Sequence, residues 1–305
     1  MRPLSLSLER SLAGRTQDRA VRTLQRTLAG LQEQATTGLR VNRPSDDPTA
    51  FERARYFEAE SARIDGHLKT VSAGRLWVDE TGAALADLAD YAATAHTIAV
   101  QGRNDTMNLE EREALAKRVD SLLAQSVDRL NAQVDGEYLF AGNRTAQKPF
   151  AADGAPATAD GTLADFAGAR LRRIGPNVDL AVNVSGERAQ TLPGGGLATD
   201  AFRTLATALR ANDGAAVTAA LDGITAARDH FIELGSESGE ASSRLTEAEA
   251  QLSGANLRAQ ARRSELEDVD MFEVAAGLQK TQGHLEAALR TVATVRQRSL
   301  LDYLR

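Results

Sequence analysis

Asp46 and Asp47 are adjacent carboxylates, the kind of side chain that performs general acid–base catalysis. Catalysis by two carboxylates needs a buried site that separates their pKa values. These aspartates instead precede Pro48, where the first turn of a helix needs side-chain acceptors for its free N–H groups. The sequence therefore favours a helix cap at Asp47 with a solvated neighbour at Asp46, and catalysis is the less favoured alternative.

Patterns typical of metal and phosphate sites are missing from the sequence. None of the four histidines has a partner at metal-ligand spacing, and they are His67, His96, His230 and His284. There is no Gly-rich loop followed by Lys-Ser/Thr, so the glycines at 194–196 are better interpreted as a hinge. The absence of cysteine excludes thiol catalysis, disulfides and Cys-ligated zinc. We expect no enzyme activity, no metal and no cofactor.

Prolines divide the chain into regions that must position any functional surface. They are confined to the start and the middle of the sequence: Pro3, Pro44, Pro48, Pro149, Pro156, Pro176 and Pro193. Because proline breaks helix interiors, residues 49–148 and 194–305 are free to be largely helical. Apolar residues make up 42% of the chain and aromatic residues only 4%, which suits helix packing. The fold class predicted is mainly α with a small β-rich insert.

The insert is predicted between the two helical regions, at residues 142–197. Short apolar runs bounded by turn residues indicate strands there: Leu163–Phe166, Leu171–Ile174 and Asp179–Val184. Before it, a turn at Asp135-Gly136 precedes a predicted strand at Tyr138–Phe140. After it, Asp200 is predicted to cap a helix containing Phe202, Leu205 and Leu209.

Both ends of the chain carry apolar residues at helical spacing. The N-terminal stripe consists of Val21, Leu24, Leu28 and Leu31. The C-terminal stripe consists of Leu278, Leu285, Leu289, Val292, Leu300 and Leu304. A helical pattern also extends over roughly 60 residues, from about Ser242 to Arg305. Together these patterns indicate a coiled-coil-like, elongated bundle formed by the two ends. A helix break is expected near Gly254, Gly277 or Gly283.

A connector follows the N-terminal helix at residues 38–48. Gly38 suits the left-handed position that ends a helix, and Arg43 is biased to an extended conformation by Pro44. The connector residues singled out for the site are Gly38, Arg40, Asn42, Arg43, Pro44, Asp46, Asp47 and Pro48. An ordinary loop between helices is the alternative interpretation of this segment.

Charge is spread unevenly along the chain. The net charge is −6, with +4 in residues 1–30 and +3 in residues 276–305, so residues 31–275 carry −13. Basic amphipathic ends could bind a membrane surface or nucleic acid. Solvated helix faces are the favoured interpretation, since no aromatic-rich basic cluster accompanies them. No apolar run approaches the roughly 18 residues of a membrane span, and the first residues lack the features of a cleaved signal peptide.

Three segments resemble bacterial flagellins and the hook–filament junction proteins related to them. These are the connector 38–48, the stretch 137–145 (Glu-Tyr-Leu-Phe-Ala-Gly-Asn-Arg-Thr), and the region from Glu267 to the C-terminus. The resemblance implies an inner assembly domain of residues 1–37 with 268–305. It also implies a helical rod of 49–141 with 198–267, and an outer domain at 142–197.

The same resemblance implies a structural role with defined partners. A junction subunit would form a ring of copies between hook-associated protein 1 and flagellin, with an export chaperone on its C-terminal region. It would be extracellular and exported without a cleaved signal peptide. Nucleic-acid binding and stable membrane insertion are not expected. A filament-forming flagellin is the alternative, followed by a secreted, membrane-active helical protein.

Overall fold

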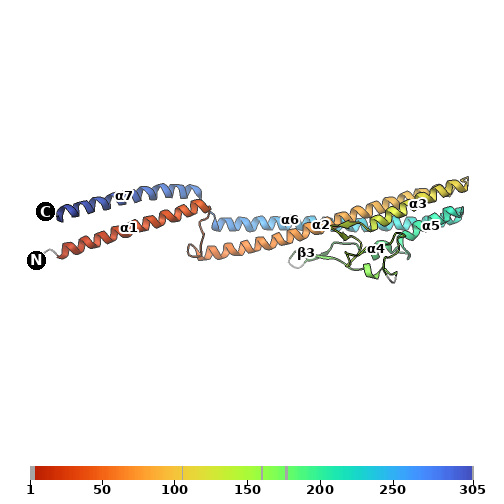
Figure 1. Ribbon diagram of the computed structural model, residues 1–305, viewed down its shortest axis with the longest axis horizontal. Coiled ribbons are helices and arrows are strands. Elements are labelled where there is room, and N and C mark those ends of the chain that lie inside the picture. The colour runs from red at the N-terminus through yellow and green to blue at the C-terminus, as the bar shows by residue number, and fades with distance from the viewer. Residues whose placement is uncertain (1–3, 105, 159–160, 176–177, 304–305) are drawn as a thin grey trace. The chain divides into compact units, whose positions relative to one another are not determined.

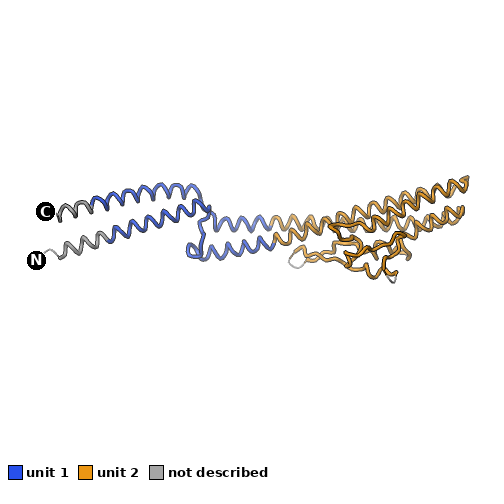
Figure 2. The backbone as a smooth tube through the Cα atoms, in the orientation of Figure 1, with its two compact units in different colours: residues 1–63, 255–305 blue, residues 64–254 orange. Residues whose placement is uncertain are grey.

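The structure is a computed structural model that describes residues 4–104, 106–158, 161–175 and 178–303, with side chains described between residues 15 and 294. The chain divides into two compact units, residues 1–63 with 255–305 and residues 64–254 (Figure 2). Two long helices run through both units, α2 (Pro48–Gly102) and α6 (Gly214–Glu267). Each unit is described separately below.

The first unit contains both ends of the chain. Helix α1 (Leu4–Thr37) lies beside α7 (Met271–Tyr303) (Figure 1). In the same unit, the beginning of α2 lies beside the end of α6, where the Ser61 hydroxyl donates a 2.5 Å hydrogen bond to Asn256. Small buried side chains at Ala54 and Ala259 suit close packing of helices there.

The second unit has a helical core. Helices α3 (Leu109–Leu130) and α5 (Ala198–Arg210) pack on each other, and their apolar faces join those of α2 and α6 in one cluster. Fully buried members include Leu88, Ile98, Leu130, Leu205, Leu209 and Phe231. Helix α3 starts with a capping box, in which Asn108 and Glu111 each accept the other's backbone N–H. Leucine, alanine and phenylalanine thus supply a core of the kind that the composition predicts.

The insert of the second unit begins after a short hairpin, β1 (Gln133–Val134) and β2 (Glu137–Tyr138). Asp135 and Gly136 both have positive φ at its turn, which confirms the predicted turn. The insert then contains the 3-10 helix η1 (Ala164–Phe166), the antiparallel pair β3 (Leu171–Gly175) and β4 (Val178–Ala181), and the short helix α4 (Gly186–Gln190). The fold is therefore mainly α with a small β insert, as predicted.

Several predicted strands differ from those observed. Leu163–Phe166 is a 3-10 turn rather than a strand, and the turn buries the ring of Phe166. The strand predicted at Tyr138–Phe140 ends at Tyr138, while Leu139 and Phe140 continue into the core as irregular chain. The strand predicted at Asp179–Val184 ends at Ala181, and Ser185 caps α4 shortly after it. Burial of apolar side chains, rather than strand pairing, explains these apolar runs.

Two helix boundaries also differ from the predictions. Helix α5 begins at Ala198, so Asp200 lies in its first turn and pairs with Arg203 instead of capping the helix. The C-terminal break falls at residues 268–270, while the three glycines predicted to cause it lie inside helices. Asp270 accepts the N–H of Phe272 over 2.8 Å and begins α7. A cap stabilises this boundary, whereas a glycine costs a helix only about 1 kcal/mol.

Among the described helices, none is both long enough and apolar enough to cross a membrane.

Candidate assembly surface

Two interruptions of the helices meet in the first unit, one at the connector and one at residues 268–270. The backbone N–H of Val269 donates to the carbonyl of Gly38 over 3.0 Å, and the N–H of Arg40 donates to the carbonyl of Glu267 over 2.5 Å. Leu39 and Asp268 form an antiparallel bridge between them. These backbone hydrogen bonds join the connection between α1 and α2 to the connection between α6 and α7. Such bonds need no particular side chain.

Gly38 occupies the position that ends α1. Its φ is +72°, in the left-handed region where glycine is strongly preferred. Its N–H donates to the carbonyl of Gln34 over 2.8 Å, which satisfies one of the free carbonyls at the helix end. Glycine here allows the chain to turn directly from α1 into the bridge with Asp268.

The paired aspartates serve the backbone of the connector. One carboxylate oxygen of Asp46 accepts the N–H groups of Asn42 (3.1 Å) and Arg43 (2.9 Å). Asp47 accepts the N–H of Ala50 over 2.9 Å in the first turn of α2, which Pro48 begins. The two carboxylates thus brace a loop and cap a helix.

The connector is extended only in part. Residues 43–46 form a turn in which the N–H of Asp46 donates to the carbonyl of Arg43 over 3.0 Å. Pro44 holds the second position of this turn, which its fixed φ favours. The expectation of an extended connector is therefore wrong for these four residues.

Arginines attach the connector to its surroundings. The Arg40 guanidinium donates to the carbonyl of Leu266 over 2.7 Å and lies 3.7 Å from a carboxylate oxygen of Asp47. Arg43 pairs with Glu33 of α1 over 2.7 Å. The charged side chains of both pairs are well exposed, so each pair contributes between about 0 and 1 kcal/mol.

The apolar stripes meet where α1 lies beside α7. All four stripe residues of α1 are half-buried, as are Leu278, Leu285 and Val292 of α7. Leu289 remains 48% exposed. Leu304 lies outside the described residues, and the side chain of Leu300 is likewise not described. Two helices therefore cover the stripes only in part, and large apolar side chains remain accessible to water.

Other residues of this surface were not singled out from the sequence. Val41 is 2% exposed and Thr281 is buried. Alternation of Leu39 and Val41 with polar residues was an available signal for the first of these. Phe272 is 89% exposed at the first turn of α7, at a position that does not continue the spacing of the C-terminal stripe.

The other candidate chemical residues remain scattered. Among the described residues, no three His, Asp or Glu side chains gather as metal ligands would. His230 interacts with the carbonyl of Arg188 over 2.7 Å, a contact within the fold. Gly195 and Gly196 have positive φ in the loop before α5.

Comparison with known proteins places this arrangement in a family. The bacterial flagellin N-terminal helical region matches residues 12–145, and the bacterial flagellin C-terminal helical region matches residues 221–304. Flagellar hook-associated protein 3 of Salmonella typhimurium is 29% identical over 123 residues, which is 39% of this chain and 38% of that protein. The match thus spans about two fifths of the length of the curated relatives.

Solved structures share the fold. The Bacillus cereus protein FlgL has a TM-score of 0.58 at 18% identity, covering 68% of this chain and 98% of that one. The flagellar junction protein FlgL from Legionella pneumophila has a TM-score of 0.59 at 13% identity, covering 71% and 100%. The two flagellin regions together span well over half of the chain. With paired terminal helices and a connector that follows the first of them, this chain belongs to the bacterial flagellin family.

Proposed function

We propose that this chain is a structural subunit of the bacterial flagellum that joins the hook to the flagellin filament. The observation that carries the proposal is the pair of terminal helices, α1 and α7, whose apolar stripes are only half covered within one chain. A soluble monomer that leaves such stripes accessible gains free energy when further helices pack against them. The names of the relatives, hook-associated protein 3 and flagellar junction protein, favour the junction among flagellar positions.

Assembly would then complete the packing that the monomer lacks. Fully burying a Leu or Val side chain contributes about 2 kcal/mol. Leu289 and the half-buried stripe residues retain part of that gain for a neighbour. The ordering of α1 and α7 costs conformational entropy, so a two-helix pair is marginal by itself. Folding of the terminal helices is in this way coupled to binding.

The partners follow from the position at the junction. Copies of the chain form a ring, with hook-associated protein 1 on one side and flagellin on the other. An export chaperone covers the C-terminal region before assembly. Residues 1–37 with 268–305 form the inner layer, 49–141 with 198–267 the rod, and 142–197 an outer domain. The subunit is extracellular, leaves the cell without a cleaved signal peptide, and acts mechanically without covalent chemistry.

A deletion strain tests the proposal. Cells lacking this chain should make hooks without filaments and release flagellin into the medium, and the wild-type gene should restore filaments. A gene carrying Leu24→Ser and Leu285→Ser should fail to restore them, whereas one carrying Thr23→Ser and Glu286→Asp, at exposed neighbours, should succeed. Normal filaments in the deletion strain would contradict the proposal.

A flagellin that builds the filament itself is the second candidate, since both matched regions are those of flagellin. The purified chain would then grow long filaments unaided. A junction subunit would instead stop at small assemblies, which electron microscopy distinguishes.

A further inference from the structure

The β3–β4 pair of the second unit is attached to the helices separately from the main core. Its apolar side chains belong to a small cluster with four buried members, Val71 and Val78 of α2, Val182 after β4, and Leu245 of α6. The main core is a different and much larger cluster around α3 and α5. Segments held by few buried contacts can open while the rest of a domain stays folded.

Arg170, directly before β3, makes the polar attachment of this segment. Its guanidinium carbon lies 4.3 Å from the ring centre of Trp77 on α2, in a cation–π contact. The same guanidinium lies 2.7 Å from a carboxylate oxygen of Glu137 on β2. One side chain of the insert therefore contacts two elements outside it. We call Arg170, Trp77 and Glu137 the Arg170 latch.

The Arg170 latch is well placed to hold β3 and β4 against α2 and α6. Trp77 is 6% exposed, so the cation–π contact is made largely away from water, where it is strongest. Glu137 also accepts a 3.0 Å hydrogen bond from the Thr145 hydroxyl, which orients its carboxylate. The Arg170 guanidinium lowers the pKa of Glu137 more than Thr145 does, while burial opposes the shift.

The backbone of Arg170, directly before β3, is hydrogen-bonded to the two residues that follow β4. The N–H of Arg170 donates to the side chain of Asn183 over 2.6 Å, and its carbonyl accepts the N–H of Val182 over 3.0 Å. On the helix side, Gly74 leaves room for the insert, because a Cβ there would lie 3.3 Å from Val182. Movement of Arg170 would therefore carry Val182 away from α2.

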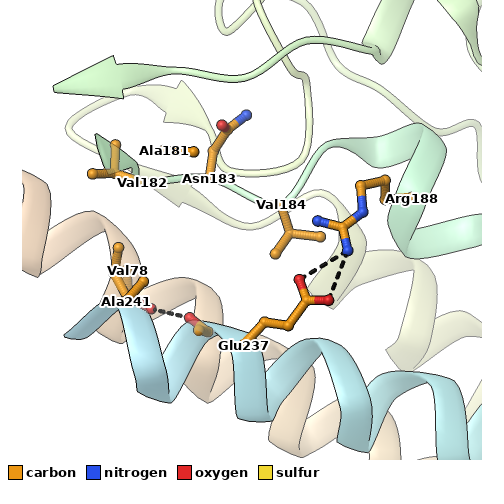
Figure 3. A pocket seen from close by; sticks show the side chains of 9 residues that line it. Val78, Ala181, Val182, Asn183, Val184, Arg188, Glu237 and Ala241 are labelled. Carbon is orange, nitrogen blue, oxygen red and sulfur yellow. Dashed lines mark hydrogen bonds and ion pairs between the residues drawn. The ribbon is translucent and has the colours of Figure 1, made fainter. Parts of the chain in front are cut away.

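Beside this attachment the contact between insert and helices is already open. A surface pocket lies there, lined by Val182 and Val184 on one side and by Val78 and Ala241 on the other. Figure 3 shows the strand segment across this space from the two helices, with Arg188 and Glu237 paired at its edge. Incomplete packing on this side leaves fewer contacts to break when the segment lifts.

We propose that the β3–β4 segment, which comprises Arg170, β3, β4 and Val182, opens from α2 and α6 as a unit while the helical core stays folded. The Arg170 latch controls how often it opens. The proposal does not depend on the position of the chain in the flagellum. Opening exposes the apolar faces of Val71, Val78 and Leu245, which the closed segment covers. The latch thus sets how often this apolar surface is presented to water.

The absence of cysteine makes the opening measurable, since an introduced thiol is the only one in the chain. Val182→Cys, at the end of the segment where it packs on the helices, and Ala206→Cys, in the main core, replace two side chains that are each 2% exposed. Labelling of the full-length protein by a thiol reagent should be faster at position 182 than at position 206. Arg170→Ala should accelerate labelling at position 182 about 10-fold, the effect of losing about 1.4 kcal/mol.

Controls separate local opening from loss of overall stability. Arg170→Ala should leave the labelling rate at position 206 unchanged, and Arg170→Lys, which keeps the charge but not the planar stacking, should be intermediate. Arg173→Ala breaks an exposed pair with Asp179 within the same two strands and should change neither rate. Equal labelling at the two positions in the parent protein would overturn the proposal. So would equal acceleration of both rates by Arg170→Ala, or no acceleration at position 182.

Discussion

The carbonyl of Gly38 accepts a 3.0 Å hydrogen bond from the N–H of Val269, although 231 positions separate the two residues in the sequence. This bond joins the end of α1 to the segment between α6 and α7. Both interruptions of the long helices therefore occur at one place, and each supports the other through backbone hydrogen bonds. Substitutions near this place can distinguish the contribution of backbone conformation to stability from the contribution of side-chain packing.

Gly38→Ala should lower the free energy of unfolding by about 1 kcal/mol, because alanine is strained at a φ of +72°. No atom lies within 4 Å of the added methyl group, so steric overlap plays no part. Gly30→Ala is the matched control, since it also meets no atom but lies inside α1. That change should stabilise the protein by up to about 1 kcal/mol. Denaturant unfolding monitored by circular dichroism measures both, and equal effects would contradict the prediction.

Asp47→Ala should destabilise the start of α2 by about 1 kcal/mol, because the N–H of Ala50 loses its acceptor. Asp47→Asn keeps an acceptor oxygen and should cost much less. Thermal unfolding of the two variants makes the comparison. Equal melting temperatures for Asp47→Ala, Asp47→Asn and the wild type would contradict the helix cap.

Acid should weaken the attachment of the insert through Glu137. Its pKa in the folded protein lies below the ordinary 4.5, chiefly because of Arg170. The resulting stabilisation is complete above the unfolded-state pKa and is lost as the pH falls through the lower, folded-state value. The wild type should therefore lose more stability on acidification below about pH 4.5 than Glu137→Gln. Chemical unfolding at a series of pH values tests this, and parallel pH profiles would exclude a role for Glu137.

Phe272→Ser should leave the stability of the monomer nearly unchanged, because the ring is 89% exposed and little burial is lost. Assembly with other flagellar subunits should weaken, because we expect a neighbouring subunit to cover this large exposed ring. Val274→Ser, two residues away and 2% exposed, is the contrasting variant and should destabilise the monomer. Melting temperatures and filament restoration in the deletion strain give the two readouts. Full restoration by Phe272→Ser would remove this residue from the assembly surface.

Amide exchange should distinguish the terminal helices from the core of the second unit. Residues 15–35 and 271–294 should exchange faster in the monomer than the core of the second unit, since two partly covered helices are folded but only marginally stable. Leu205 and Leu209 of α5, both fully buried, mark a segment that should exchange slowly. Slow exchange in α1 and α7 of the monomer would contradict coupled folding and binding.

Local rules predicted the connector well because short-range chemistry determines it. Gly38, Asp47 and Pro48 take the positions that their own conformational preferences favour, and the stripes meet where period and length place them. The prediction of an extended backbone was wrong at residues 43–46, where Pro44 supports a turn closed by the N–H of Asp46. No local signal indicated that Glu267 would accept the N–H of Arg40, since that contact depends on how distant helices end together.

The insert was harder to predict for a physical reason. Its apolar runs are short, and burial at Phe166 or Phe140 satisfies them without strand pairing. The same holds for the C-terminal break, where the cap at Asp270 outweighed the glycines of α6 and α7. Arg170 gave no sequence signal at all, because its partners Trp77 and Glu137 come from elements far away along the chain.

The bridge between Leu39 and Asp268 has a mechanical consequence. A helix pair tethered by a single strand of backbone could spin about that tether, because single bonds resist rotation weakly. Here the polypeptide crosses the junction twice, and hydrogen bonds hold the two crossings together. Torque applied to α1 and α7 must therefore twist two connections, the connector and residues 268–270, about each other. We expect the first unit to bend at this place more readily than α1 and α7 rotate about their common axis.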